Sequence, residues 1–282
     1  MHHRSLLTPL ALILAALLAA TAFAQGTLER AQESGSVTIG LANEVPYAYR
    51  DEAGNLTGEA VEVARAVFAE LGIPEIEGVI VEFGSLIPGL QAGRFDVVTA
   101  GMYITPARCE QVAFANPEYS IGEGIVVPEG NPMEIDSYAD IAADPDVRVG
   151  TGAGWVEYDY LLESGVSENQ IVTFPDAPTG MGGLNADRID VFAGTSLTMR
   201  NIAERTNGVV FVEDFEDPII DGEPVRSYGA AAFRPADSDF RDAFNEVLAD
   251  LKESGRLAEI IGEFGFGATE LPGDMTAAEL CN

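Results

Sequence analysis

A tyrosine, a threonine and an arginine lie within six residues of one another in the stretch GMYITPARCEQVAFANPEY, from Gly101 to Tyr119. The stretch begins in an apolar run that predicts a buried strand, so Tyr103 and Arg108 should follow the end of that strand. A guanidinium can donate two parallel hydrogen bonds to a carboxylate. Because the chain has 46 acidic residues, a surface salt bridge could account for Arg108 as well as a binding role could. These residues alone leave both interpretations open.

Other groups that could do chemistry are few. The only histidines are His2 and His3, at the extreme start of the chain. Their position leaves no Ser-His or Cys-His nucleophile pair and no plausible zinc site in the rest of the chain. An enzyme of this sequence would have to work with carboxylates, tyrosine or lysine. We expect no metal, and nothing in the sequence indicates a cofactor.

Residues 1–24 have the pattern of a secretory signal peptide. An apolar stretch follows Arg4, and the small-residue site Ala-Phe-Ala ends at Ala24. An uncleaved membrane anchor is the alternative, but Thr8 and Pro9 interrupt the apolar stretch. We therefore predict an exported protein, periplasmic in a bacterium.

Cys109 and Cys281 are the only cysteines. In an exported protein a pair of cysteines is more often bridged than free, so we expect a disulfide between them, although spacing alone does not establish contact. The bond would tie the C-terminal tail to the segment directly after Arg108.

The charge balance limits the range of partners. Removal of residues 1–24 takes away one arginine and no acid, which leaves 14 basic against 46 acidic residues, a net charge of 14 − 46 = −32. Nucleic acid and anionic membranes carry the same sign of charge and are not expected as partners.

Strand-like and helix-like stretches alternate along the rest of the chain. Strands are predicted at residues 36–42, 78–83, 95–101, 146–152, 170–175 and 189–195. Helices are predicted at residues 59–72, 85–93, 155–165, 177–188 and 240–265. This order predicts an α/β fold of two units, each with a mainly parallel sheet and helices on both faces.

In open α/β sheets, ligands bind beyond the carboxyl ends of the strands. The loops at those ends cover residues 43–47, 83, 101–108, 150–155 and 194–198. They can meet only if the two units face each other across a cleft.

The block LIPGLQAGRFDVVTAGMYITPARCEQVAFANPEY resembles periplasmic solute-binding proteins of the family that serves polar amino acid ABC importers. The resemblance extends over nearly all of residues 36–266 and implies a type II periplasmic binding fold. Two crossover strands, expected near Glu123 to Val127 and Tyr228 to Phe233, would join two lobes as a hinge. The implied division is a signal peptide at 1–24, the first part of lobe 1 at 25–125, lobe 2 at 126–229, and the return to lobe 1 with the tail at 230–282.

The resemblance also implies a function. A small ligand would close the lobes, and the closed form would dock on the membrane subunits of an ABC importer. We expect the protein to act as a monomer.

Arg108 lies where the family places the arginine that holds the carboxylate of the ligand. Three other positions depart from the amino acid binders. Tyr103 stands in place of a Ser or Thr, Thr195 in place of an Asp that pairs with the α-ammonium, and Trp155 in place of a Thr that helps to hold the carboxylate. The usual α-amino acid clamp is therefore incomplete.

In place of that clamp, the predicted loops carry aromatic residues. Tyr47, Phe83, Tyr103 and Trp155 all fall on them, and Glu44 adds one acidic acceptor. Aromatic faces attract diffuse cations, although any one of these rings could be part of a core. Together they indicate a site for a compact zwitterion with a delocalised cation.

The segments ANEVPYAY, EFGSLIPGLQAGRFDVV and AGMYITPARCEQVAFANP resemble most the ectoine and hydroxyectoine binders. Ectoine is a cyclic amidinium carboxylate. The resemblance implies that Arg108 holds the carboxylate, Glu44 the amidinium N–H groups, and Tyr47, Phe83 and Tyr103 the ring.

Other ligands and one other class of function stay open. A polar or basic amino acid, or a betaine, is the alternative ligand. A periplasmic dehydratase on the same fold is the alternative function, with Glu44 as its acid or base. A sensor ectodomain would need a membrane span and a cytoplasmic output, and neither is recognisable in the sequence.

Overall fold

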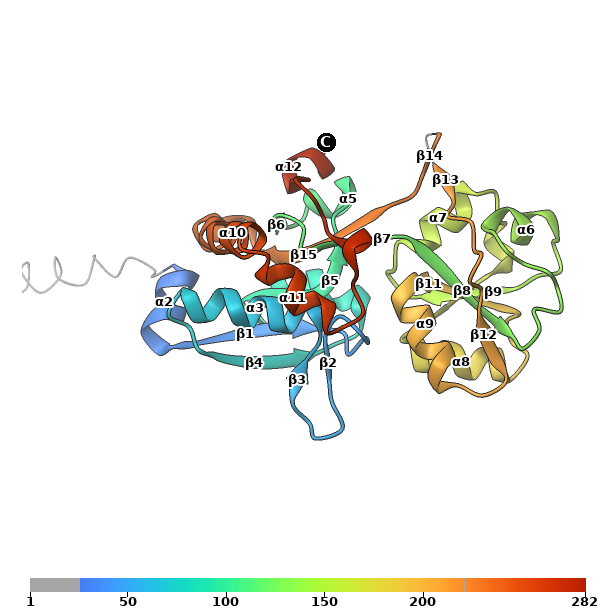
Figure 1. Ribbon diagram of the computed structural model, residues 1–282, viewed down its shortest axis with the longest axis horizontal. Helices are drawn as coiled ribbons and strands as arrows, with labels where there is room; N and C mark the ends of the chain where they lie inside the picture. The colour runs from blue at the N-terminus through green and yellow to red at the C-terminus, as the bar shows by residue number, and fades with distance from the viewer. Residues whose placement is uncertain (1–25, 221) are drawn as a thin grey trace, which may run out of the picture.

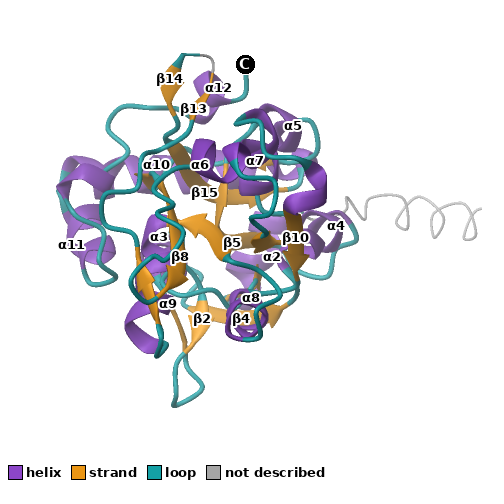
Figure 2. Ribbon diagram, turned by 90° about the vertical axis from the view of Figure 1, so that its right-hand side faces the viewer, coloured by secondary structure: helices purple, strands orange, loops and turns teal. Residues whose placement is uncertain are grey.

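The computed structural model describes residues 26–220 and 222–282, so the predicted signal peptide lies outside the described residues. These residues form two α/β lobes side by side (Figure 1), which confirms the predicted fold class. Lobe 1 is defined here by the first and last parts of the chain, and lobe 2 by the middle. Figure 2 looks onto lobe 2, with its helices outside its strands.

Lobe 1 is built on one mixed sheet. Its strands, in spatial order, are β4 (Glu75–Ile80), β1 (Ser36–Leu41), β5 (Val97–Tyr103), β15 (Ser227–Phe233) and β6 (Ala113–Phe114), with β7 (Tyr119–Ile121) also paired to β15. The first three strands are parallel, and β15 runs antiparallel to its neighbours. A small hairpin, β2 (Tyr49–Arg50) and β3 (Leu56–Thr57), projects from this lobe.

Lobe 2 repeats this arrangement. Its strands, in spatial order, are β10 (Ile171–Phe174), β9 (Val149–Gly152), β11 (Val191–Thr195), β8 (Glu123–Pro128) and β12 (Val209–Phe211). Again the first three strands are parallel, and β8 is antiparallel to both of its neighbours. The hairpin of β13 (Ile219–Ile220) and β14 (Glu223–Pro224) lies on the return path.

Helices cover both faces of each sheet. Those of lobe 1 are α2 (Thr27–Ser34), α3 (Glu59–Glu70), α4 (Leu86–Gln91), α5 (Pro106–Cys109), α10 (Ser238–Glu253), α11 (Arg256–Gly262) and α12 (Ala277–Leu280). Those of lobe 2 are α6 (Tyr138–Ala143), α7 (Glu157–Glu163), α8 (Ala177–Asn185) and α9 (Ser196–Arg205). Short 3₁₀ turns occur at η1 (Phe83–Ser85), η2 (Glu168–Gln170), η3 (Pro235–Asp237) and η4 (Ala268–Glu270).

Each sheet face has its own hydrophobic core. In lobe 1, α3, α10 and α11 pack on one face, and α4, α5 and α12 on the other. In lobe 2, α6 and α7 cover one face, and α8 and α9 the other. Helix α3 shows how the sequence specifies this packing, because Val61, Ala64 and Phe68 recur at helical spacing and are all fully buried.

Two local predictions were wrong. The single helix expected at residues 240–265 is two helices, α10 and α11, because Gly255 adopts a left-handed conformation with φ of 78° and ends the first. The strand expected at 78–83 is β4, which ends at Ile80, so Phe83 begins the turn η1 instead.

The chain passes between the lobes twice. The first passage is at Gly122, between β7 in one sheet and β8 in the other, and the second precedes β15. Side chains tie the two passages together: Asp217 accepts a hydrogen bond from the N–H of Glu123 at 2.7 Å, and Arg226 donates to Oγ of Ser120 at 3.0 Å. These contacts join the two passages into one hinge region.

Two carboxyl groups are buried in the core of lobe 1. Glu59 is 0% exposed, and among the described residues neither of its carboxyl oxygens has a hydrogen-bond partner. Glu118 accepts one hydrogen bond, from the N–H of Ala231 at 3.1 Å. Burial raises the pKa of Glu118 from 4.5 to about 8, and burial, followed by the charge of Glu118, raises the pKa of Glu59 well above its ordinary value.

Because the folded state holds these protons more tightly than the unfolded state does, the two carboxyls stabilise the fold only at low pH. For Glu118, this contribution to the free energy of unfolding is lost as the pH rises from 4.5 to about 8, by at most about 1.4 kcal/mol per pH unit. The contribution of Glu59 falls in the same direction as the pH rises. We expect Glu59→Gln to flatten this decline and to be more stable than the wild type at pH 9. Denaturant unfolding at pH 5, 7 and 9 measures this, with the exposed Glu70→Gln on the same helix as control. An unchanged slope in Glu59→Gln would contradict the prediction.

Candidate functional site

One pocket between the lobes is lined by all seven residues that the sequence singled out. Lobe 1 supplies five of them and lobe 2 two, and the full lining is Glu44, Tyr47, Phe83, Gly101, Tyr103, Arg108, Trp155, Val156, Glu157 and Thr195. The pocket has a volume of about 20 Å³, which is about the space of one water molecule. The two lobes are therefore closed on each other in this structure.

The residues come from the carboxyl ends of the strands. Glu44 and Tyr47 follow β1, Tyr103 ends β5, and Thr195 ends β11. The parallel strands of each lobe point their carboxyl ends at the other lobe, so the topology of both sheets brings these loops together.

Three sets of hydrogen bonds cross from one lobe to the other. The hydroxyl of Tyr47 donates to Oγ1 of Thr195 at 3.0 Å. The hydroxyl of Thr198 lies 2.8 Å from Oε1 of Glu44 and 3.1 Å from the carbonyl oxygen of Val45. Nη2 of Arg108 donates to the carbonyl oxygen of Gly154 at 3.0 Å.

Glycine permits the closest approach of the two lobes. Gly154 has φ of 82°, and a Cβ atom there would lie 2.8 Å from Cα of Gly84 in the opposite lobe. A side chain at residue 154 would therefore separate the loops and lengthen the hydrogen bond to Arg108.

Arg108 stands on the one-turn helix α5. The side chain of Thr105 caps this helix, and Nη1 of Arg108 donates to the carbonyl oxygen of Tyr103 at 2.9 Å. The guanidinium also lies over the ring of Phe83, 5.4 Å from its centroid. Burial lowers the pKa of Arg108 and nearby Glu157 raises it, but an arginine stays charged. A fixed positive charge therefore borders the pocket.

Two carboxyl groups border the same pocket. Burial raises the pKa of Glu44 from 4.5 to about 8; the hydrogen bond from Thr198 lowers it, and the charge of Glu157 raises it further. Burial likewise raises the pKa of Glu157 to about 7, while its own backbone, Glu123 and Arg108 lower it. A cation placed in the pocket would favour the ionised form of both groups.

Glu157 forms a pair with Glu123, the first residue of β8. Burial, followed by the charge of Glu157, raises the pKa of Glu123 well above its ordinary value. Among the described residues, neither carboxyl oxygen of Glu123 has a hydrogen-bond partner. Each of these buried carboxyl groups disfavours the ionised form of the other. The pair links the pocket to the start of the crossover strand.

The aromatic side chains form two walls. Tyr47 and Tyr103 are 1% and 4% exposed and pack with Tyr119 and Phe266 in the core of lobe 1. The ring of Tyr47 lies directly on Gly101, where a Cβ atom would be 2.4 Å from Cδ1 of the tyrosine. Trp155 packs in lobe 2 and meets Phe83 from lobe 1. Among the described residues, the buried hydroxyl of Tyr103 has no hydrogen-bond partner.

A larger cavity of about 470 Å³ adjoins this pocket and shares Glu44, Phe83 and Trp155 with it. Its other walls come mainly from α8 and α9, including Met181 and Ile202. The two spaces therefore meet at these three side chains.

Three contributors to the site are not predicted from the sequence: Glu157, Thr198 and the carbonyl group of Gly154. Glu157 was recognisable only as an acid in the first turn of a helix, which is common. Thr198 lies within the loop segment 194–198, but no local pattern marks its hydroxyl. A backbone carbonyl carries no signal in the sequence at all.

Comparisons with known proteins agree with this architecture. The model of the bacterial extracellular solute-binding proteins, family 3, matches residues 37–268. The chain belongs to this family. A probable amino-acid ABC transporter periplasmic-binding protein of Sinorhizobium fredii is 38% identical over 91% of this chain and 86% of its own length.

Two solved structures are also similar to this family member. The crystal structure of EhuB in complex with hydroxyectoine matches with a TM-score of 0.83 and 36% identity, over 91% of this chain and 98% of EhuB. The ancestral amino acid-binding protein AncCDT-1, a precursor of cyclohexadienyl dehydratase, matches with a TM-score of 0.73 and 26% identity, over 84% of this chain and 99% of its own.

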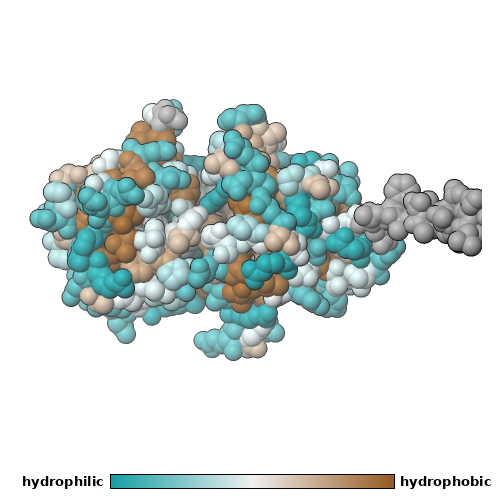
Figure 3. Space-filling view, turned by 180° about the vertical axis from the view of Figure 1, so that it is seen from behind, coloured by the Kyte–Doolittle hydropathy of each residue, from teal (hydrophilic) through white to brown (hydrophobic). Residues whose placement is uncertain are grey.

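The protein is thus the solute-binding component of an ABC amino-acid importer, which binds a small ligand and partners with membrane permease subunits. Its relatives are periplasmic or extracellular. Within residues 26–220 and 222–282, no helix has the length and apolar character needed to cross a membrane. The face of the molecule in Figure 3 is mainly hydrophilic, with separate apolar patches on both lobes.

The fluorescence of Trp155 offers a test of the carboxyl pair. Trp155 is the only tryptophan and lies two residues from Glu157, whose pKa is raised to about 7. We expect the tryptophan emission of the ligand-free protein to change with a midpoint near pH 7, as the pair loses its first proton. Glu157→Gln should abolish this transition, while the exposed Glu163→Gln on the same helix should keep it. A transition near pH 7 that persists in Glu157→Gln would assign it to another group.

Proposed function

We propose that this protein captures ectoine or hydroxyectoine and delivers it to the importer. The observation that carries the proposal is that one pocket joins the guanidinium of Arg108, the carboxyl group of Glu44 and four aromatic side chains. Ectoine has the complementary groups, a carboxylate and a cyclic amidinium.

The closed pocket has room for about one water molecule, so the lobes would have to open to admit the ligand. Each half of the ligand finds a partner among the residues that line the pocket. Arg108 is held by two carbonyl oxygens, which leaves further guanidinium N–H groups to donate to a carboxylate. Glu44 accepts a hydrogen bond from Thr198 on one oxygen and can accept amidinium N–H groups on the other. The rings of Tyr47, Phe83 and Tyr103 offer faces and edges to the flat, delocalised cation.

The electrostatics of the closed lobes support a cationic ligand. Burial between the lobes raises the pKa of Glu44 and of Glu157, so closure without a cation disfavours their ionised forms. An amidinium bound beside Glu44 would compensate the buried carboxylate, so the ligand would stabilise the closed state by contacts with both lobes. The likeness to EhuB in complex with hydroxyectoine points the same way.

One observation favours an amino acid as the second candidate ligand. Thr195 stands where amino acid binders carry an acid for the α-ammonium, but Glu157 borders the same pocket and could accept that group instead. A betaine is less well matched, because it has no N–H group for either carboxylate.

A periplasmic dehydratase is the candidate from another class. Glu44 and Glu157 have pKa values raised to about 8 and about 7, which suit proton transfer near neutral pH. The similarity to AncCDT-1, a precursor of cyclohexadienyl dehydratase, is the reason to consider this activity, although the relatives found are binding proteins. Product formation from prephenate or arogenate would establish this activity.

Calorimetric titration of the mature protein tests the proposal directly. We expect saturable binding of ectoine and hydroxyectoine, weakened at least about tenfold in Arg108→Lys, which keeps the charge but loses the planar fork. Glu44→Gln should weaken binding by a similar factor, because it removes the charge that meets the amidinium. The exposed substitutions Arg94→Lys and Glu70→Gln serve as controls. No heat with ectoine, together with clear binding of glutamine or arginine, would refute the proposed ligand.

A further inference from the structure

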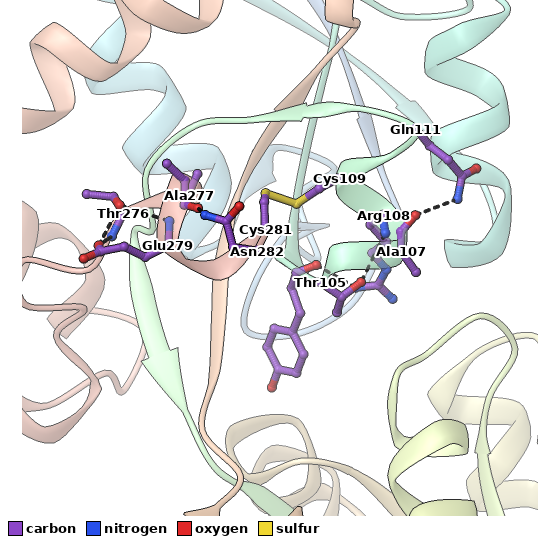
Figure 4. Close-up of a disulfide and its surroundings, with 12 residues drawn as sticks. Thr105, Ala107, Arg108, Cys109, Gln111, Thr276, Ala277, Glu279, Cys281 and Asn282 are labelled. Atoms are coloured by element: carbon purple, nitrogen blue, oxygen red, sulfur yellow. Dashed lines mark hydrogen bonds between the residues drawn. A yellow bond between two sulfur atoms is a disulfide. The ribbon is translucent and has the colours of Figure 1, made fainter. Parts of the chain in front are cut away.

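The C-terminal tail, residues 268–282, lies against the segment that carries Arg108. Cys281 forms a disulfide with Cys109, and their Cα atoms are 5.7 Å apart. Figure 4 shows this bond between α12 and α5, with Arg108 on the same turn as Cys109 and its side chain directed away from the disulfide. The disulfide therefore joins two residues that are 172 positions apart in the sequence, and one of them, Cys109, directly follows Arg108.

Helix α5 depends on its surroundings for its position. It has four residues, and an isolated single turn is not stable in water. Besides the two hydrogen bonds of the Arg108 side chain, it is fixed by the cap from Thr105 and by a hydrogen bond from Gln91 to the carbonyl oxygen of Gln111, just beyond it. The tail adds a covalent bond and the packing of Leu280 on the same core as Ile104.

The tail is itself fixed to the body of lobe 1 and to the hinge. The N–H of Ala277 donates to Oδ1 of Asn116 at 3.1 Å. Nearer its start, the carbonyl oxygen of Leu271 accepts from Ser120 at 3.3 Å, and that of Thr269 accepts from Arg226. Ser120 and Arg226 belong to the two passages between the lobes, so the tail runs from the hinge to the helix of Arg108.

We propose that the tail and its disulfide are a positioning element, which holds the Arg108 guanidinium at the angle and depth required to meet the ligand carboxylate as the lobes close. This inference rests on the proposed function, because it takes Arg108 as the ligand anchor. The disulfide does not touch the pocket. It acts through the position of α5. Its removal therefore changes none of the side chains that line the pocket, but it lets Arg108 move.

A double-mutant cycle tests the proposal. Titrations with ectoine compare the wild type, Cys109→Ser/Cys281→Ser, Arg108→Lys and the combined variant, all well below their melting temperatures. We expect the serine pair to weaken binding by about tenfold in the wild-type background, the scale of one side chain that has to be ordered on binding. In the Arg108→Lys background the same pair should change the affinity less than twofold, since the positioned group is already lost. Ala278→Ser, an exposed change on α12, is the matched control.

Hydrogen exchange provides a readout that needs no ligand. The amides of residues 104–112 should exchange faster in the serine pair than in the wild type, and the amides of lobe 2 should not change. If ectoine does not bind the wild type, the proposed ligand fails, and this exchange result alone decides whether the tail positions α5. An equal loss of affinity in both backgrounds, or unchanged protection of residues 104–112, would overturn the inference.

Discussion

Closure of the lobes encloses charges of both signs at one interface, and the contacts made there depend on how those charges are compensated. Arg108 is held by carbonyl oxygens from both lobes, at 2.9 Å from that of Tyr103 and 3.0 Å from that of Gly154. Glu44 and Glu157 share the pocket with it, and burial raises the pKa of each toward or above neutrality. A cation placed beside these carboxyl groups would favour their ionised forms.

The topology of the two sheets brings these groups face to face. In each lobe three parallel strands end at the cleft, so that loops distant in sequence converge there. The antiparallel strands β8 and β15 carry the chain across, and Glu123 at the start of β8 interacts electrostatically with Glu157 at the pocket. The C-terminal tail connects the hinge, through its contact with Ser120, to α5, through the disulfide at Cys109.

Much of this arrangement was predictable from local patterns. Helical spacing in α3 and the alternation of strands and helices are enough to predict the fold class, because they reflect which face of each element must be buried. The loop positions of Glu44, Tyr47, Phe83, Tyr103, Arg108, Trp155 and Thr195 followed from the strand ends, and the structure brings all seven around one pocket. Element boundaries were less predictable. The left-handed turn at Gly255 divides the last long helix, and a glycine in a helical pattern does not by itself reveal that conformation.

The sequence by itself determined the chemical character of this protein: a strongly acidic α/β chain with two cysteines, no histidine beyond residue 3, and aromatic and charged residues at its strand ends. Only the tertiary structure decided which of these groups meet. The contacts of Thr198 with Glu44, of Glu157 with Glu123 and of Arg108 with Gly154 join residues that are 34 to 154 positions apart. Such pairs depend on how two lobes pack across a cleft, and so does the burial that sets their pKa values. No local sequence pattern encodes the distance between the two members of such a pair, or the removal of water from around them.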